Sequence, residues 1–385
     1  MIKYIFFILP FLAFSQAKLI EGVIIDSDDG KKIGNADIYF KLNSFGTISN
    51  DKGVFTFDFS KVPKTDTLIV SHLGYKEYKI KVEDFLKLEK KIHLIEHAFE
   101  LDEVIISTTN TLKILKEAFE NYDNNHVSEN IIYIGSIKQV SEENKKITRF
   151  AYSDIFLKIP KKNSKKNSII PTKKQYKKEN KSELNNFQLI KLNQLANLLK
   201  IKIQLSYFIN NIKKFDSVSL EEKKYGSYSV YEIVLEKRIN QFKKSTISLI
   251  IEKESKGILS MKLEGDRGEG VDKWHVIFEN NDEKISRIPT FSTGNIVFRP
   301  YKEKWILREI NTTLNVIYNI ESDNQKQSLE NYNYVRILID GIYSDEPVRN
   351  NKTFDLTNDI FNQIETNSIF NENKLSLREL KFITE

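Results

Sequence analysis

Apolar residues alternate with polar ones over much of this chain, and the alternation is most regular across residues 18–107. There, about seven short alternating stretches are separated by turn signals, among them DDG at 28–30 and NDKG at 50–53. Alternation of this kind places successive side chains on opposite faces of a strand, and glycine supplies the positive φ of a tight turn. Residues 17–107 are therefore predicted to form a small β-sandwich.

The length of 385 residues suits about two domains, and the content of 40% hydrophobic and 29% charged residues is typical of globular proteins. The sequence contains no cysteine. Disulfides, thiol catalysis, thiolate metal sites and a lipidated N-terminal cysteine are therefore excluded. The stability of the fold has to come from packing.

Motifs within the first hundred residues resemble a known family: EGVIID at 21–26, IGNADI at 33–38, GTISNDKGVF at 46–55, SHLGY at 71–75 and LDEVII at 101–106. Together they look like the carboxypeptidase regulatory-like domain, which also precedes the plug of TonB-dependent outer-membrane receptors in Bacteroidetes. The resemblance implies a transthyretin-like sandwich and an accessory module without peptidase activity. Lys32 and Ile33 stand where the family usually has a proline, a departure that concerns only the local turn.

The first 16 residues have the organisation of a secretory signal peptide. Lys3 precedes an apolar run of ten residues, 5–14, and Ala13 and Ser15 are small residues at the positions that a signal peptidase reads. The run is too short for a membrane-spanning helix, which takes about 20 apolar residues. We therefore expect an exported protein, soluble after removal of the signal and periplasmic or associated with the outer membrane.

Residues 108–385 are predicted to form a second, α+β domain, so that the whole protein is mainly β. Apolar residues at helical spacing in 108–122 predict a bridging helix, and similar spacing suggests helices near 187–199 and 356–370. Strands are expected at 131–140, 147–156, 229–235, 246–251, 258–263, 274–278, 296–298, 305–310, 314–318 and 332–339. Short turns between them indicate a curved antiparallel sheet, closed, open or cupped. Residues 231–261 resemble the half-barrel of lipoprotein-carrier-like envelope proteins.

Residues 158–181 contain ten lysines and one glutamate, a local charge of +9 in a chain whose net charge is +6. Without this segment the rest of the chain would carry −3. Because like charges at this density repel one another, we expect a basic, solvated loop. It would make at most weak contact with an anionic membrane surface. Its single aromatic, Tyr176, does not favour nucleic-acid binding.

Two patterns of metal-binding residue types occur in the sequence, and each has a simpler explanation. His93 and Glu96 have the spacing of zinc ligands, but in a strand they point to opposite faces. Acidic and amide side chains gather in two turns and suggest calcium, although these residue types are also the usual formers of turns: Asp26, Asp28, Asp29, Asn50 and Asp51. We expect no metal and no cofactor.

No catalytic residue is assigned, because no nucleophile elbow, phosphate-binding loop or dinucleotide fingerprint occurs in the sequence. The concave face of the predicted sheet offers a candidate ligand surface made of aromatic residues: Tyr228, Tyr231, Trp274, Phe298, Tyr301 and Trp305. Aromatic residues are also common in ordinary sheet packing. Convergence of these side chains on one site is therefore a question for the structure.

Three functions from different classes remain open at this point. The first is an exported, non-enzymatic cell-envelope protein that binds a lipid, a glycan or a protein partner. The second is an exported hydrolase with a dispersed active site. The third is a structural or assembly accessory of an outer-membrane receptor. We expect the first, because the sequence carries no catalytic motif.

Overall fold

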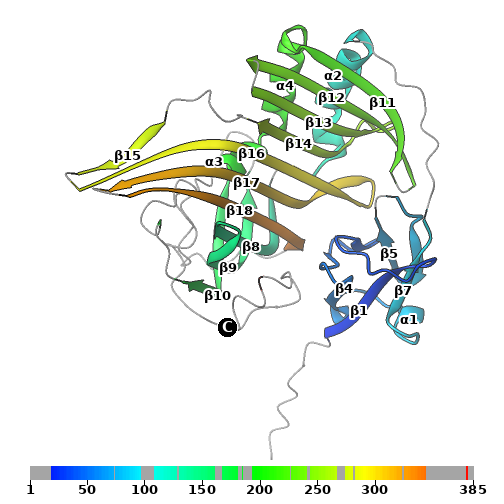
Figure 1. Ribbon diagram of the computed structural model, residues 1–385. Coiled ribbons are helices and arrows are strands. Elements are labelled where there is room, and N and C mark those ends of the chain that lie inside the picture. The colour runs from blue at the N-terminus through cyan, green and yellow to red at the C-terminus, as the bar shows by residue number, and fades with distance from the viewer. Residues whose placement is uncertain are drawn as a thin grey trace, which may run out of the picture.

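The computed structural model describes most of the chain in two domains (Figure 1). The residues it describes are 19–72, 74–96, 108–127, 130–160, 167–180, 184, 193–225, 227–240, 243–266, 274–280, 282–322, 325–343 and 379. The predicted signal peptide and the helix expected at 356–370 lie outside them. Among these residues no helix is long and apolar enough to cross a membrane.

The N-terminal domain is a sandwich of two small sheets, as predicted. One sheet has the order β4-β1-β7 and the other β3-β2-β5-β6. Their bounds are β1 Leu19–Asp26, β2 Asp37–Phe40, β3 Gly46–Ile48, β4 Val54–Asp58, β5 Thr67–Ser71, β6 Tyr78–Lys81 and β7 Lys91–Leu94. The short helices η1 (Phe59–Lys61) and α1 (Val82–Phe85) complete it.

The core of this sandwich comes from the inward-facing residues of the alternating stretches. Ile24, Ile38, Phe40, Phe55 and Leu68 are all fully buried in one cluster. Phenylalanine rings pack against one another within the cluster at centroid distances of 4.9–5.3 Å, some tilted or edge to face and one pair stacked. The apolar residues that the alternation places on the inner faces are therefore the residues that form the core.

The C-terminal domain is built on one curved antiparallel sheet, which has eleven strands in the part that the structure describes. The main order is β10-β9-β8-β18-β17-β16-β14-β13-β12-β11, and β15 pairs with β16. The bounds are β8 Ile131–Glu143, β9 Lys146–Ile159, β10 Ser168–Glu179, β11 Ser217–Tyr225, β12 Tyr228–Asn240, β13 Lys243–Glu252, β14 Ile258–Asp266, β15 His275–Glu279, β16 Glu283–Tyr301, β17 Lys304–Ser322 and β18 Gln325–Tyr343.

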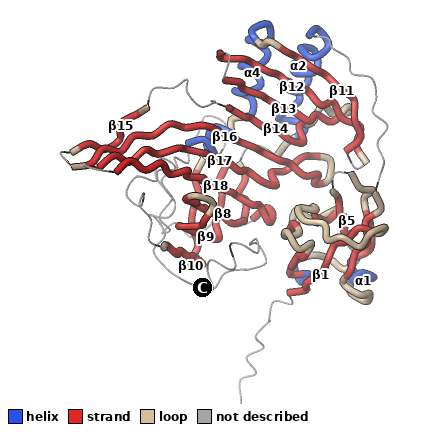
Figure 2. Tube along the Cα trace, viewed as in Figure 1, coloured by secondary structure: helices blue, strands red, loops and turns tan. Residues whose placement is uncertain are grey.

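Helices cover one face of this sheet (Figure 2). They are α2 (Thr108–Asn125), α3 (Asn193–Leu198), α4 (Ile201–Asn211) and the short η2 (Ile212–Lys214). Leu115 of α2 and Leu205 of α4 are fully buried in one cluster with Ile233 and Leu249 of the sheet. The apolar stripe of α2 is therefore core, and the helix at 108–122 is confirmed with its end three residues later.

Several sequence-based expectations differ from the structure. Residues 305–310 and 314–318 belong to one strand, β17, because Thr312 and Thr313 continue its pairing with β16. Helix α4 and strand β11 were not predicted, since their polar and apolar residues follow neither period clearly.

The expectation of a basic loop over 158–181 is wrong for residues 168–179, which form β10 and pair antiparallel with β9. Ile169 is 2% exposed and packs into the main core, whereas Lys174 is exposed. A lysine is common on an edge strand, because the strand has no second neighbour and a long side chain such as that of Lys174 reaches water. The charge of the segment is therefore compatible with a strand at this edge.

Candidate functional site

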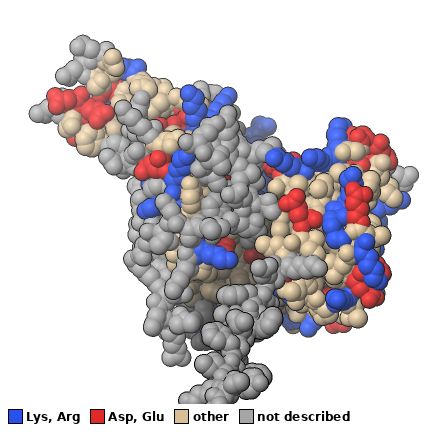
Figure 3. All heavy atoms as spheres, turned by 90° about the horizontal axis from the view of Figure 1, so that it is seen from below, with Lys and Arg blue, Asp and Glu red and all other residues tan. Residues whose placement is uncertain are grey.

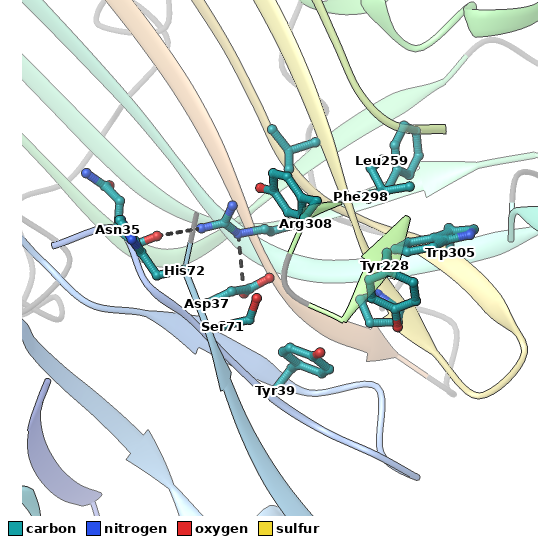
Figure 4. Close-up of a pocket in the computed structure, with 13 residues that line it drawn as sticks. Asn35, Asp37, Tyr39, Ser71, His72, Tyr228, Leu259, Phe298, Trp305 and Arg308 are labelled. Atoms are coloured by element: carbon teal, nitrogen blue, oxygen red, sulfur yellow. Dashed lines mark hydrogen bonds and ion pairs between the residues drawn. The ribbon is translucent and has the colours of Figure 1, made fainter. Parts of the chain in front are cut away.

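Two hairpin tips of the large sheet reach the N-terminal domain. In the first, Tyr225 at the end of β11 pairs with Tyr228 at the start of β12. In the second, Tyr301 at the end of β16 pairs with Lys304, and Trp305 follows. Side chains from both hairpins lie close to β2 and β5 of the N-terminal domain (Figure 4).

These elements enclose a cavity of about 120 Å³ between the domains. The N-terminal domain contributes mainly polar side chains and the C-terminal domain mainly aromatic and apolar ones. The lining residues are Asn35, Asp37, Tyr39, Ser71, His72, Tyr225, Tyr228, Leu259, Val297, Phe298, Pro300, Trp305 and Arg308.

An ion pair across the domain boundary forms the polar end of the cavity. Arg308 Nε lies 3.3 Å from Asp37 Oδ1, and the two side chains are only 11% and 14% exposed. Arg308 also donates a hydrogen bond of 3.2 Å from Nη2 to the carbonyl oxygen of Asn35. Because both partners are largely shielded from water, screening by salt is weak at this pair.

Aromatic rings form the opposite wall. Tyr228 and Trp305 pack edge to face with ring centroids 5.1 Å apart. Tyr39 is buried, and its hydroxyl donates to Glu77 Oε1 at 3.2 Å. Burial raises the pKa of Tyr228 to about 12 and also raises the pKa values of Tyr39 and Tyr225. All three hydroxyls therefore stay protonated at neutral pH and are able to donate hydrogen bonds.

A buried histidine supports the aromatic wall from behind. The ring of His126 stacks on Tyr122 at 4.3 Å and meets Phe298 edge-on at 4.8 Å. The Nε2 atom of His126 lies 2.9 Å from the carbonyl oxygen of Ile258. The backbone N–H of Val127 donates a hydrogen bond of 3.0 Å to the carbonyl oxygen of Trp305. The end of α2 is thereby held against the strands that carry the wall.

A second arginine joins the domains beside the cavity. Arg299 is fully buried, and its Nη2 donates to the carbonyl oxygens of Ser44 at 2.8 Å and Asp340 at 2.9 Å. The Ser44 hydroxyl in turn accepts from the N–H of Ile342 at 3.2 Å. The two bonds to Ser44 cross the boundary and hold the domains together beside the cavity.

Three of the six aromatic candidates from the sequence line this cavity: Tyr228, Phe298 and Trp305. Tyr231 and Tyr301 are half-buried against the main core outside the lining. Trp274 precedes β15, at the far end of the sheet, and is 41% exposed. The candidate surface is therefore not one continuous patch.

Sequence reasoning did not find the residues that complete the site: Asp37, Tyr39, Tyr225 and Arg308. No local pattern connects Asp37 in the first domain with Arg308 in the second. A weak signal existed in the two tyrosines that flank the turn between β11 and β12, since such residues lie opposite each other in a hairpin.

The residues that suggested a metal have other roles in the structure. Asp26 accepts hydrogen bonds from the N–H groups of Asp28 and Asp29 and from the Tyr75 hydroxyl, which contributes most to lowering the pKa of Asp26. Asn50 likewise accepts from backbone N–H groups in its own turn. Among the described residues, no three His, Asp or Glu side chains gather as ligands of one ion.

Comparison with known proteins identifies the first domain. Residues 20–106 match the family model of the CarboxypepD_reg-like domain, which confirms the resemblance read from the motifs. No curated protein matches the chain. Among solved structures, the crystal structure of MucB in complex with MucA(peri) aligns with a TM-score of 0.21 and 11% identity. That alignment covers 60% of this chain and 94% of the other.

Proposed function

We propose that the protein is an exported, non-enzymatic cell-envelope module that binds a partner at the cavity between its two domains. The observation that carries this proposal is the cavity itself, with an ion pair at one end and an aromatic wall at the other. Ligand sites occur preferentially at domain interfaces and combine apolar walls with a few placed polar groups. The CarboxypepD_reg-like domain fits such a partner-binding role.

The size of the cavity limits which classes of ligand fit inside it. Its volume of about 120 Å³ is below the range of about 300–1,000 Å³ that encloses most of a drug-sized ligand. A long acyl chain does not fit inside it. A single side chain of a protein partner or a single unit of a glycan does.

Charge on the visible surface supports a ligand without high net charge. In the view from below, the N-terminal domain carries basic and acidic side chains interspersed (Figure 3). Mixed charges create no strong field of one sign, so this face favours neither a polyanion nor a polycation.

Tryptophan fluorescence provides a direct test, because the chain has only two tryptophans. In a Trp274→Phe background, emission reports on Trp305 in the cavity. Neutral oligosaccharides, envelope-lipid vesicles and peptides from outer-membrane proteins are titrated in turn. We expect one class to change the emission, and Ser71→Phe, which fills the cavity, to abolish the change. The proposal fails if no class changes it.

A hydrolase is the second candidate, because Ser71 and His72 both line the cavity. In a Ser-His-Asp arrangement the carboxylate orients the imidazole. Here Asp37 pairs with Arg308, and His72 packs edge-on against Tyr75 at 5.4 Å. Turnover of chromogenic esters or glycosides by the wild type, lost in Ser71→Ala, would replace the binding proposal with this one.

Export is the remaining part of the proposal, and it rests on the signal-like residues 1–16. Expression of the full-length chain with its native N-terminus, followed by intact-mass measurement, tests it. We expect a mature protein that has lost residues 1 to about 15 and appears in the periplasmic or extracellular fraction. A cytoplasmic product of full mass would contradict export.

A further inference from the structure

We infer that the cavity between the domains binds one uncharged sugar unit of a glycan. This inference rests on the proposed function and names the ligand class of the same site. It follows from the arrangement of the cavity, in which the charged and small polar side chains lie at one end and the rings of Tyr228 and Trp305 lie at the other (Figure 4).

The ion pair at the polar end selects against a charged ligand. Arg308 and Asp37 lie 3.3 Å apart and neutralise each other. An anion placed beside this pair would meet the carboxylate of Asp37, and a cation would meet the guanidinium of Arg308. Both encounters bring like charges together where little water screens them.

A neutral ligand with adjacent hydroxyl groups is able to use both members of the pair. A guanidinium only donates hydrogen bonds and an ionised carboxylate only accepts them, whereas each hydroxyl both donates and accepts. Two neighbouring hydroxyls of a sugar therefore match Arg308 and Asp37 together. The protonated hydroxyl of Tyr228 adds a donor on the opposite side.

The aromatic wall suits the apolar face of the same ligand. A pyranose ring presents C–H groups on its faces and hydroxyls around its rim. Tyr228 and Trp305 are amphipathic side chains with broad apolar surfaces and polar tips, so they offer such a face a matching surface. An aliphatic side chain would cover this wall but leave the polar end unmatched, which costs affinity.

The volume limits the enclosed part to one unit. The cavity of about 120 Å³ is well below the roughly 300 Å³ at which sites begin to enclose most of a drug-sized ligand. That space holds most of one six-membered ring, and further units of a glycan would extend into solvent. We expect modest affinity for a single unit, because few atoms are enclosed.

The test uses the full mature chain with Trp274→Phe, so that emission reports on Trp305. The probes are the methyl glycosides of glucose, galactose and mannose, each together with its charged uronate and amino-sugar analogues. We expect at least one neutral glycoside to bind, and its own uronate and amino analogues to bind about tenfold more weakly because each buries an unmatched charge.

Two tyrosines of β12 provide matched variants. Tyr228→Ala removes part of the wall and is expected to weaken binding of the neutral glycoside about tenfold. Tyr231→Ala, three residues away and outside the lining, is expected to leave it unchanged. Circular dichroism and the thermal midpoint of both variants establish that they are folded.

The possible outcomes separate this inference from the proposed function. If peptides change Trp305 emission while no neutral glycoside does, the sugar inference is overturned and the proposed function stands. Equal binding of neutral and charged glycosides also overturns it. If sugars, vesicles and peptides all leave Trp305 unchanged, both proposals fail.

Discussion

Burial lowers the pKa of His126 to about 4 from the ordinary value of 6.5, against the opposing effect of two backbone carbonyl oxygens. The unfolded chain therefore binds a proton more readily than the folded protein does below about pH 6.5. The neutral ring of His126 contributes fully to the free energy of unfolding above about pH 6.5, and this contribution is lost as the pH falls toward about 4. We expect the protonation of His126 alone to lower the free energy of unfolding by about 3 kcal/mol between about pH 6.5 and about pH 4.

Urea unfolding near pH 7.5 and near pH 4 measures this effect in the wild type and in His126→Phe. The variant keeps a flat ring between Tyr122 and Phe298 but has nothing to protonate. We expect the wild type to lose about 3 kcal/mol more than the variant. Equal losses would show that the pKa of His126 is not lowered in the folded protein.

Gly46 lies at a contact between the two domains, against Arg299. A Cβ added there would be 2.7 Å from the carbonyl oxygen of Ile38 and would collide with the guanidinium of Arg299. Because the backbone and a fully buried arginine have little room to move, Gly46→Ala is expected to lower the free energy of unfolding by about 1–3 kcal/mol.

Gly265→Ala is the matched control for Gly46→Ala. The nearest atom to its added Cβ is the Ser292 hydroxyl oxygen at 3.2 Å, which is able to rotate away. We expect its free energy of unfolding to stay within about 0.5 kcal/mol of the wild type. A similar loss in both variants would mean that the domain contact at Gly46 is not tight.

At the scale of single elements, two substitutions in β10 test whether residues 168–179 form a packed strand or a loop. Ile169 is 2% exposed in the main core, so Ile169→Ala should cost about 2–4 kcal/mol. Lys174 on the same strand is exposed, and Lys174→Ala should change stability by less than about 0.5 kcal/mol. Urea unfolding measures both. If Ile169→Ala is also neutral, residues 168–179 behave as the loop expected from their charge.

The lysines of β10 also lead to a prediction about membranes. The local charge of +9 over residues 158–181 favours anionic vesicles by charge alone, and salt screens this attraction. We expect weak binding at low salt and almost none at about 0.15 M salt, where the screening length is about 8 Å. Vesicle sedimentation measures it, with Lys174, Lys177 and Lys178 changed to Gln as the control. Tight binding that resists salt would contradict this prediction.

At the scale of the whole molecule, the two domains have separate apolar cores. The residues of the N-terminal cluster, such as Ile24, Phe55 and Leu68, all come from within its own sandwich. The boundary is instead bridged by Arg299 and Arg308, whose partners are mostly backbone oxygens. Each core therefore forms without apolar residues from the other domain.

It follows that residues 17–107 should fold alone. A domain of about ninety residues buries enough surface for a marginal core, and the isolated sandwich should be less stable than in the full chain because it loses the boundary contacts. Circular dichroism is expected to show β structure with a single cooperative thermal transition. A disordered or helical spectrum would contradict an independent sandwich.

Local features of the sequence predicted much of this fold. The alternation around Ile24, Ile38 and Phe55 indicated the sandwich and its buried residues, because the period of a strand is a property of neighbouring residues. The motifs around Gly46 and Gly74 indicated the family of the first domain. The same alternation indicated most strands of the second sheet. It did not reveal β10, where lysines at an edge obscure the period.

Only the tertiary structure decided which residues form the site. Asp37 and Arg308 are far apart in the chain, and their pairing depends on how two hairpin tips meet another domain. The sequence alone determined most of the strands, the turns and the positions of the aromatic residues, because these follow from local chemistry. Register, domain contacts and the cavity depend on packing between distant segments, and no local pattern specifies which distant surfaces will meet.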